Sequence, residues 1–168
     1  MKKNAQGFSL VELLIVVVII GILATLSVAG LMASKRSANE GSAVSSIRLL
    51  HSAQMTYASS FGAGEFAGDV GSPNTTVFSE LQGRKLIDDV LGSAAKSGYN
   101  FVGARQVSSS SQPAQFFFSA IPVSSDPIMR TGNHRFGIAT DGVLRSDLTL
   151  TDQFADIAAV SAAPPLPN

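Results

Sequence analysis

A long apolar segment near the N-terminus, carrying one acidic residue, dominates this sequence. Residues 7–34 read GFSLVELLIVVVIIGILATLSVAGLMAS, and among them only Glu12 is charged. The 22 residues from Leu13 to Ser34 contain no ionisable group. As a helix they would span roughly 33 Å, which is enough to cross the hydrocarbon core of a bilayer. The sequence therefore predicts a transmembrane helix.

Glu12 is unusual in such a helix because a carboxylate is costly in lipid. The cost is about 2.5–3.5 kcal/mol near the bilayer centre and less near an interface. A simple membrane anchor gains nothing from this charge. We therefore expect Glu12 to have a functional role and a partner that neutralises it.

The residues around Glu12 carry a resemblance to a known family. A basic start is followed by Gly7-Phe8, and Glu12 lies four residues beyond Phe8. This pattern resembles the class III prepilin leader of type IV pilins and of the pseudopilins of type II secretion. The resemblance implies that a membrane peptidase removes residues 1–7 on the cytoplasmic side and that the new N-terminal Phe8 is N-methylated. It also implies that the apolar helix is retained.

The same resemblance implies a role for Glu12 in assembly. A Phe8 ammonium, from a neighbouring copy or from the same chain, would pair with Glu12 when the helices pack in a fibre core. Such a pair would fix the axial register, because an unpaired buried charge costs several kcal/mol. The expected partners are further copies of this chain, a prepilin peptidase and methyltransferase, and the pilus assembly machinery of the inner membrane. The bilayer holds the helix before assembly, and no specific nucleic acid and no cofactor are expected.

Other interpretations of the apolar segment are weaker. A secretory signal peptide would have an apolar region of 7–15 residues before a small-residue cleavage site. Ser27-Val28-Ala29 fits such a site loosely, but the apolar segment is too long. A plain transmembrane anchor remains open. A soluble core helix would need a polar face, which this segment lacks.

The helix is expected to continue beyond the apolar segment. Residues 35–60 contain no proline, and apolar or small residues recur every three or four positions from Ala43 to Phe61, with Gln54 interrupting the pattern. That spacing predicts an amphipathic helix. We therefore expect four parts: a cleaved leader (1–7), a transmembrane or fibre-core half-helix (8–34), an amphipathic half-helix (35–60) and a globular head (61–168). The head has roughly 105 residues, enough for a modest core.

The head pattern predicts an α+β pilin fold, in which about four antiparallel strands pack on the second half of the long helix. Short helices are expected within 78–94, with Arg84 and Lys85 spaced for ion pairs with Asp88 and Asp89. Candidate strands are 99–102, 115–123, 135–140 and 143–146. Asp141-Gly142 separates the last two as a hairpin signal. The tail from Thr149 to Asn168 has little periodicity and is expected to be flexible or to wrap the surface.

A second resemblance covers part of the head. Residues 37–62 resemble a group of bacterial pilins with a SANEASAV-type motif. Residues 97–101, FFFSAIPVSS and HRFGIATDGVLRSD resemble the head strands of that group. Many type IV pilins close a C-terminal loop with a disulfide, but this chain has no cysteine. Packing and hydrogen bonds alone must therefore hold its C-terminal region.

The composition offers no catalytic site. The chain has two histidines and no cysteine, and its formal net charge is zero, which argues against a strong nucleic-acid footprint. Neither a G-x-S-x-G elbow nor a P-loop is present. Four carboxylates of the last third could form a calcium site, although their spacing matches no EF-hand loop and turn or surface roles explain them better: Asp126, Asp141, Asp147 and Asp152. Aromatic residues of the head are expected to pack in the core, among them Tyr57, Phe61 and Phe116–Phe118.

The sequence thus predicts a structural subunit of a type IV pilus rather than an enzyme. The chain would begin as a precursor in the bacterial inner membrane and end in an extracellular fibre. The alternative is a pseudopilin of a type II secretion system, which shares the leader, the helix and the glutamate. A third possibility is a membrane-anchored binding module that never polymerises.

Overall fold

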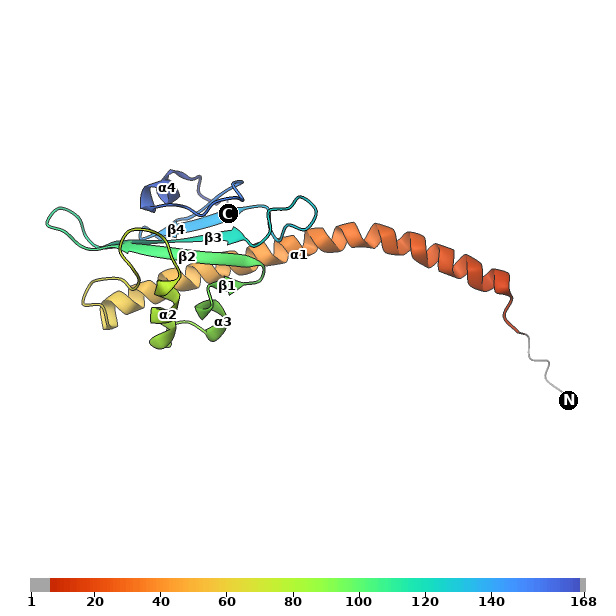
Figure 1. Cartoon of the computed structure of the whole chain (residues 1–168), viewed down its shortest axis with the longest axis horizontal. Coiled ribbons are helices and arrows are strands. Elements are labelled where there is room, and N and C mark those ends of the chain that lie inside the picture. The colour runs from red at the N-terminus through yellow and green to blue at the C-terminus, as the bar shows by residue number, and fades with distance from the viewer. Residues whose placement is uncertain (1–6, 167–168) are drawn as a thin grey trace. The chain divides into compact units, whose positions relative to one another are not determined.

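The computed structural model describes residues 7–166, apart from the side chain of Ala29, so Lys2, Lys3 and the leader before Gly7 lie outside the described residues. The chain divides into two units, Met1–Lys35 and Arg36–Asn168. One helix, α1 (Leu10–Ser60), contributes to both. The remaining elements all belong to the second unit (Figure 1).

Helix α1 begins two residues later than the sequence suggested, because Ser9 is its N-cap. It runs without interruption through Gly21, Gly30 and Gly41, where an added side chain would meet open space. No proline lies within it, so every interior amide can donate to the carbonyl four residues earlier.

The head contains a five-stranded antiparallel sheet in the order β1-β2-β3-β4-β5. Its strands are β1 (Ala95–Lys96), β2 (Tyr99–Gln106), β3 (Gln115–Pro122), β4 (Arg135–Ala139) and β5 (Leu144–Asp147). The α+β prediction is confirmed, and the four expected strands are present. The extra strand, β1, is only two residues long and therefore leaves no alternating pattern to detect.

The predicted hairpin at Asp141-Gly142 is present between β4 and β5. Gly142 has a φ of +73°, and its amide donates to the carbonyl of Ala139 at 2.9 Å. Glycine adopts positive φ without the steric cost that a side chain brings. The local sequence therefore fixes the register of this pair, in which Ile138 lies opposite Leu144.

One face of the sheet packs on α1 and on two short helices, α2 (Thr76–Gly83) and α3 (Asp89–Gly92). Ile47 and Leu50 of α1 are completely buried in this core. The aromatic side chains form edge-to-face contacts, with ring centroids 4.5 Å apart for Phe66 and Phe116 and 5.8 Å for Phe78 and Phe118. Such pairs add stability beyond their buried area.

The other face of the sheet is covered by the C-terminal tail. The tail forms α4 (Ile157–Ala162), which lies against β3 and β4, and the amide of Leu166 donates to the carbonyl of Leu144. Of the two expectations for this tail, wrapping the surface is the one observed, and a helix was missed. Phe154 and Val160 pack on Phe117 and Ala139 in a second small core. Both faces of β3 are therefore buried.

Two expectations for the head were wrong. Phe61 is about half exposed and lies beneath the guanidinium of Arg84, 4.9 Å from its ring centroid, instead of in the core. The expected helical ion pairs do not form because α2 ends before Lys85, which has a φ of +57°. Asp88 instead caps α3 by accepting from the amide of Leu91.

Candidate functional site

The site indicated by the sequence lies at the beginning of α1. Gly7, Phe8 and Ser9 are non-helical, and the helix begins at Leu10. The Ser9 hydroxyl accepts from the amide of Val11 at 3.3 Å, and the Ser9 carbonyl accepts from the amide of Leu13 at 3.2 Å. The Gly7-Phe8 bond therefore lies in non-helical chain just before the N-cap.

Glu12 completes this cap. Its Oε2 accepts a hydrogen bond at 2.9 Å from the backbone amide of Ser9, one residue beyond the nitrogen of Phe8. Ser9 and Glu12 thus cap the first turn much as a capping box does, except that the Ser9 hydroxyl binds the amide of Val11 instead of that of Glu12. The carboxylate also lies near the positive end of the helix dipole, which favours its charge.

Ser9 was missed in the analysis of the sequence, although a signal for it exists. The order Ser9-Leu10-Val11-Glu12 matches the S-x-x-E pattern that marks a capping box before an apolar run. The resemblance alone implied only one partner for Glu12, the new amine on Phe8. In the uncut chain the structure gives Glu12 a different partner, the amide of Ser9.

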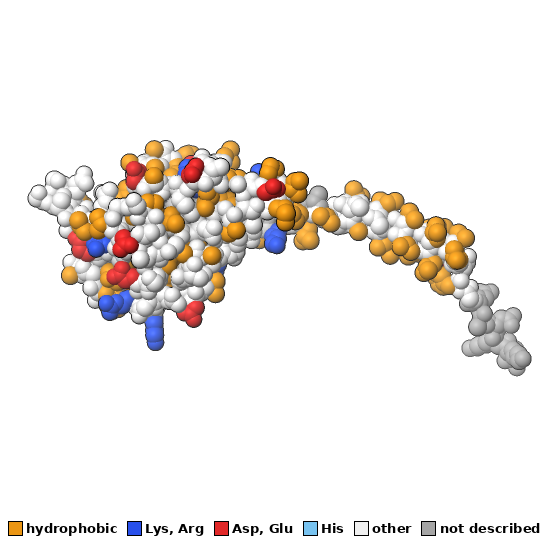
Figure 2. All heavy atoms as spheres, viewed as in Figure 1, with side chains coloured by type: hydrophobic (Ala, Val, Ile, Leu, Met, Phe, Trp, Pro, Cys, Tyr) orange, Lys and Arg blue, Asp and Glu red, His pale blue; other side chains and the backbone are white. Residues whose placement is uncertain are grey.

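The first half of α1 exposes its side chains all round. It is long and apolar enough to cross a membrane, and its large hydrophobic residues from Leu10 to Leu31 are about half or more exposed. Figure 2 shows hydrophobic side chains along this segment. Such a continuous apolar surface requires lipid or other protein chains around it.

The carboxylates considered for calcium have other partners. Asp141 binds Arg145, with Oδ2 and Nη2 2.6 Å apart, and Asp147 forms an ion pair with Arg135. Asp126 accepts from the amides of Ile128 and Met129 in a turn, and these bonds lower the pKa of its carboxyl. Residues 7–166 contain no group of three His, Asp or Glu side chains placed to hold a metal ion.

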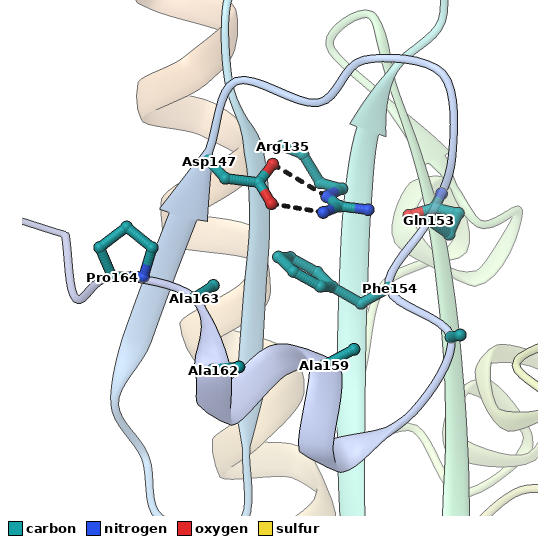
Figure 3. Close-up of a pocket in the computed structure, with 9 residues that line it drawn as sticks. Arg135, Asp147, Gln153, Phe154, Ala159, Ala162, Ala163 and Pro164 are labelled. Carbon is teal, nitrogen blue, oxygen red and sulfur yellow. Dashed lines mark hydrogen bonds and ion pairs between the residues drawn. The ribbon is translucent and has the colours of Figure 1, made fainter.

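A cavity of about 450 Å³ lies between the sheet and the C-terminal tail (Figure 3). Arg135 and Asp147 point toward each other at one side of it, and Phe154 and the alanines of α4 line the rest. The guanidinium of Arg135 also donates to the carbonyl of Asp152 at 2.7 Å and lies 3.7 Å from the ring centroid of Phe154. Through these contacts, the Arg135 guanidinium holds the C-terminal tail against the sheet.

Comparison with known proteins agrees with the site at the N-terminus. Residues 2–28 match the family described as "Prokaryotic N-terminal methylation motif". The chain therefore carries a prepilin-type class III leader, and the predicted resemblance is confirmed for this segment. No solved structure matches the chain.

Two curated relatives are similar to about a third of the chain. The type II secretion system core protein G of Aeromonas hydrophila is 45% identical over 56 residues, which are 33% of this chain and 39% of that protein. The type II secretion system core protein G of Dickeya chrysanthemi is 44% identical over 52 residues, which are 31% of this chain and 34% of that protein. The similarity thus spans well under half the length of either relative.

Proposed function

We propose that this protein is a pseudopilin, a filament-forming structural subunit of a type II secretion system. The observation that carries the proposal is the methylation motif over residues 2–28, in which Gly7-Phe8 precedes Glu12 and a long apolar helix. The names of the two relatives favour a secretion system over a pilus. This choice reverses the order of the two functions that the sequence suggested.

The first step of the proposed mechanism is cleavage after Gly7 by a prepilin peptidase on the cytoplasmic side. The non-helical, exposed chain from Gly7 to Ser9 supports this step, because a protease needs an accessible, non-helical backbone. Phe8 is 80% exposed, so both sides of the bond are open. Cleavage converts the Phe8 nitrogen from an amide into an amine, which the peptidase-methyltransferase then methylates.

The second step exchanges the partner of Glu12. Before cleavage the carboxylate accepts from the amide of Ser9, which suits a residue near a polar interface. When helices gather in a filament, the carboxylate enters an apolar bundle, and a charged partner offsets the cost of losing water. A Phe8 ammonium supplies that charge, and a helix out of register would leave Glu12 unpaired.

The third step is burial of the apolar half-helix. Its exposed side chains leave lipid and pack against the same segment of neighbouring copies. The head, residues 61–168, then lies outside the bundle on residues 35–60 of α1. This division into a leader, a fibre-core half, an amphipathic half and a head follows the sequence prediction and remains part of the proposal.

A type IV pilus subunit is the second candidate. The resemblance of residues 37–62 and of the head strands to a group of bacterial pilins favours it. Both candidates share the leader, the inner-membrane precursor and the homopolymer, and they differ in the filament. A pilus extends from the cell surface, whereas a pseudopilus is a short periplasmic piston.

Deleting the gene from its native cell tests the proposal. We expect the loss of type II secreted proteins from the medium, with no change in long surface filaments seen by electron microscopy. If instead the filaments disappear while secretion stays normal, the protein is a pilus subunit and not a pseudopilin.

Mass spectrometry of the native protein should find methylated Phe8 at the N-terminus. An uncut N-terminus and a monomeric protein would overturn both the pseudopilin and the pilus subunit, and would support a membrane-anchored binding module.

A further inference from the structure

One end of the head carries a group of exposed apolar side chains. The sheet register places Pro122 opposite Tyr99 and Asp147 opposite Arg135, so these four residues mark the same end of the sheet. The chain segments that leave this end carry four exposed apolar residues, which we call the proximal rim: Val123, Ile128, Met129 and Leu148. Figure 2 shows hydrophobic side chains gathered at this end of the head.

The loop between β3 and β4 holds the centre of the proximal rim. Ile128 is 77% exposed and Met129 is 71% exposed. Both follow Asp126, which accepts hydrogen bonds from their amides at 2.8 and 3.1 Å. The only carboxylate of the loop is thus occupied within the turn, and the two apolar side chains project from it.

The base of this loop is fastened to α1. Asn39 donates to the carbonyl of Thr131 at 2.9 Å, and Glu40 accepts from the amide of Asn133 and contacts the His134 ring. The loop is also fastened to the turn between β1 and β2, because the Thr131 hydroxyl donates to the carbonyl of Gly98 at 2.6 Å. Figure 1 shows the loop extending beyond the end of β3 beside α1. The base of this loop is therefore held beside residues 39 and 40 of α1.

Residues 39 and 40 follow closely after the apolar segment that is expected to span the membrane. The uncharged part of the helix ends at Ser34, and Asn39 lies about 7.5 Å further along a helix. The headgroup region of a bilayer extends about 5–8 Å beyond the hydrocarbon core on each side. A loop fastened to Asn39 and Glu40 is thus tethered to the chain only five residues beyond the uncharged segment.

The charges near the proximal rim suit a lipid surface. Arg36 follows the apolar helix, and Arg130 follows Met129 in the loop. Within residues 7–166, neither guanidinium forms an ion pair with an acidic side chain. Two cations beside exposed apolar side chains are typical of segments that bind the interface, where the apolar groups enter and the cations bind phosphate.

We infer that the proximal rim docks on the outer leaflet of the inner membrane while the chain is unassembled, and so fixes the orientation of the head. The partner is the phospholipid bilayer, contacted by Ile128 and Met129 through its headgroup region and by Arg130 through its phosphates. The inference rests on membrane insertion of α1 and goes beyond the proposed function, because it concerns the precursor before any filament forms.

The natural absence of cysteine allows a direct test with single labels. The full chain carrying Met129→Cys is labelled with an environment-sensitive fluorophore and inserted into vesicles of phosphatidylcholine and phosphatidylglycerol. Val107→Cys is the matched control, because Val107 is also exposed but follows β2 at the opposite end of the sheet. We expect a blue shift and quenching by spin-labelled lipid at position 129, and neither at position 107.

Two further measurements identify the occupant. Ile128→Ser in the Met129→Cys chain should reduce the blue shift, whereas Val70→Ser, a change on an exposed valine elsewhere, should not. Equal spectra at positions 129 and 107 would overturn the inference. A blue shift at 129 that disappears when the protein is diluted in lipid would also overturn it, because a second copy would then be the occupant. Neither outcome bears on whether the chain later forms a filament.

Discussion

Gln54 of α1 pairs its side-chain amide with both backbone polar atoms of Ala67. Its Nε2 donates to the carbonyl of Ala67 at 2.9 Å, and its Oε1 accepts from the amide of Ala67 at 2.9 Å. Gln54 is 1% exposed, so water cannot replace either bond. In sequence this residue only interrupted an apolar pattern, whereas in the structure it ties the glycine-rich loop after α1 to the helix.

Gln54→Leu is therefore expected to destabilise the head. Two buried backbone groups of Ala67 lose their partners, and each costs about 1–3 kcal/mol when left unpaired. Urea unfolding of the full chain in detergent, followed by near-ultraviolet circular dichroism, measures the change. Both tyrosines, Tyr57 and Tyr99, are buried in the head and report on it. Ser52→Ala, two residues before Gln54 and on the exposed side of α1, should have little effect, and equal midpoints for the two variants would contradict the prediction.

Arg135→Lys is expected to loosen the C-terminal tail while leaving the inner core intact. Lysine keeps the charge but loses the two-pronged bond to Asp147 and the stacking on Phe154, together worth about 1–2 kcal/mol. Hydrogen exchange should quicken in residues 151–163. Arg145→Lys is the control, since it alters an arginine-aspartate pair at the hairpin. Unchanged exchange in the tail of the Arg135 variant would show that the apolar contacts of Phe154 and Val160 suffice.

Acid should weaken the β4–β5 hairpin through Asp141. The hydrogen bonds from the Arg145 side chain lower the pKa of the Asp141 carboxyl in the folded protein. A folded pKa below the ordinary value of about 3.9 stabilises the protein above that value, and this contribution is lost as the pH falls through the folded pKa. Asp141→Asn should thus show a smaller loss of stability between neutral pH and about pH 3 in urea unfolding. A wild-type acid dependence in this variant would refute the assignment.

Two substitutions of Glu12 distinguish its role as a helix cap from the role of its negative charge in assembly. Glutamine can still accept from the Ser9 amide, whereas alanine cannot. We expect Glu12→Ala and Glu12→Gln both to give a stable, cleaved membrane protein that fails to enter filaments, because neither can pair with a Phe8 ammonium. Immunoblots of membrane and filament fractions measure the outcome. Filament assembly restored by glutamine would mean that capping, and not charge, is what assembly needs.

Replacing Gly7 with valine should block removal of the leader. The residue before the cut is expected to fit the peptidase only without a side chain, so the full-length precursor should accumulate on an immunoblot. Gly21→Ala is the matched control, because an added Cβ there meets open space and the helix continues. Normal processing of the Gly7 variant would remove the main support for the cleavage site.

The sequence by itself determined the N-terminal segment and most strand positions. The leader, the apolar span and the Asp141-Gly142 hairpin each depend only on residues that are adjacent in the sequence. They can therefore be recognised without knowing any distant contact. The three consecutive phenylalanines of β3 also implied a strand buried on both faces, because neighbouring side chains point to opposite sides. The expectations drawn from the sequence include the strand but not the burial of its second face.

Only the tertiary structure decided what covers that second face and what the isolated polar residues do. The tail folds back because Gly137 leaves room for Phe154, whose ring atoms would lie 2.8 Å from an added Cβ. Gln54 meets Ala67, and Asn39 meets Thr131, 92 residues away. Such partners depend on which surfaces meet after folding, and no local periodicity encodes them. For Glu12, the sequence pointed to the Phe8 amine that cleavage would create. The structure added a second partner, the backbone amide of Ser9, which binds Glu12 in the uncut chain.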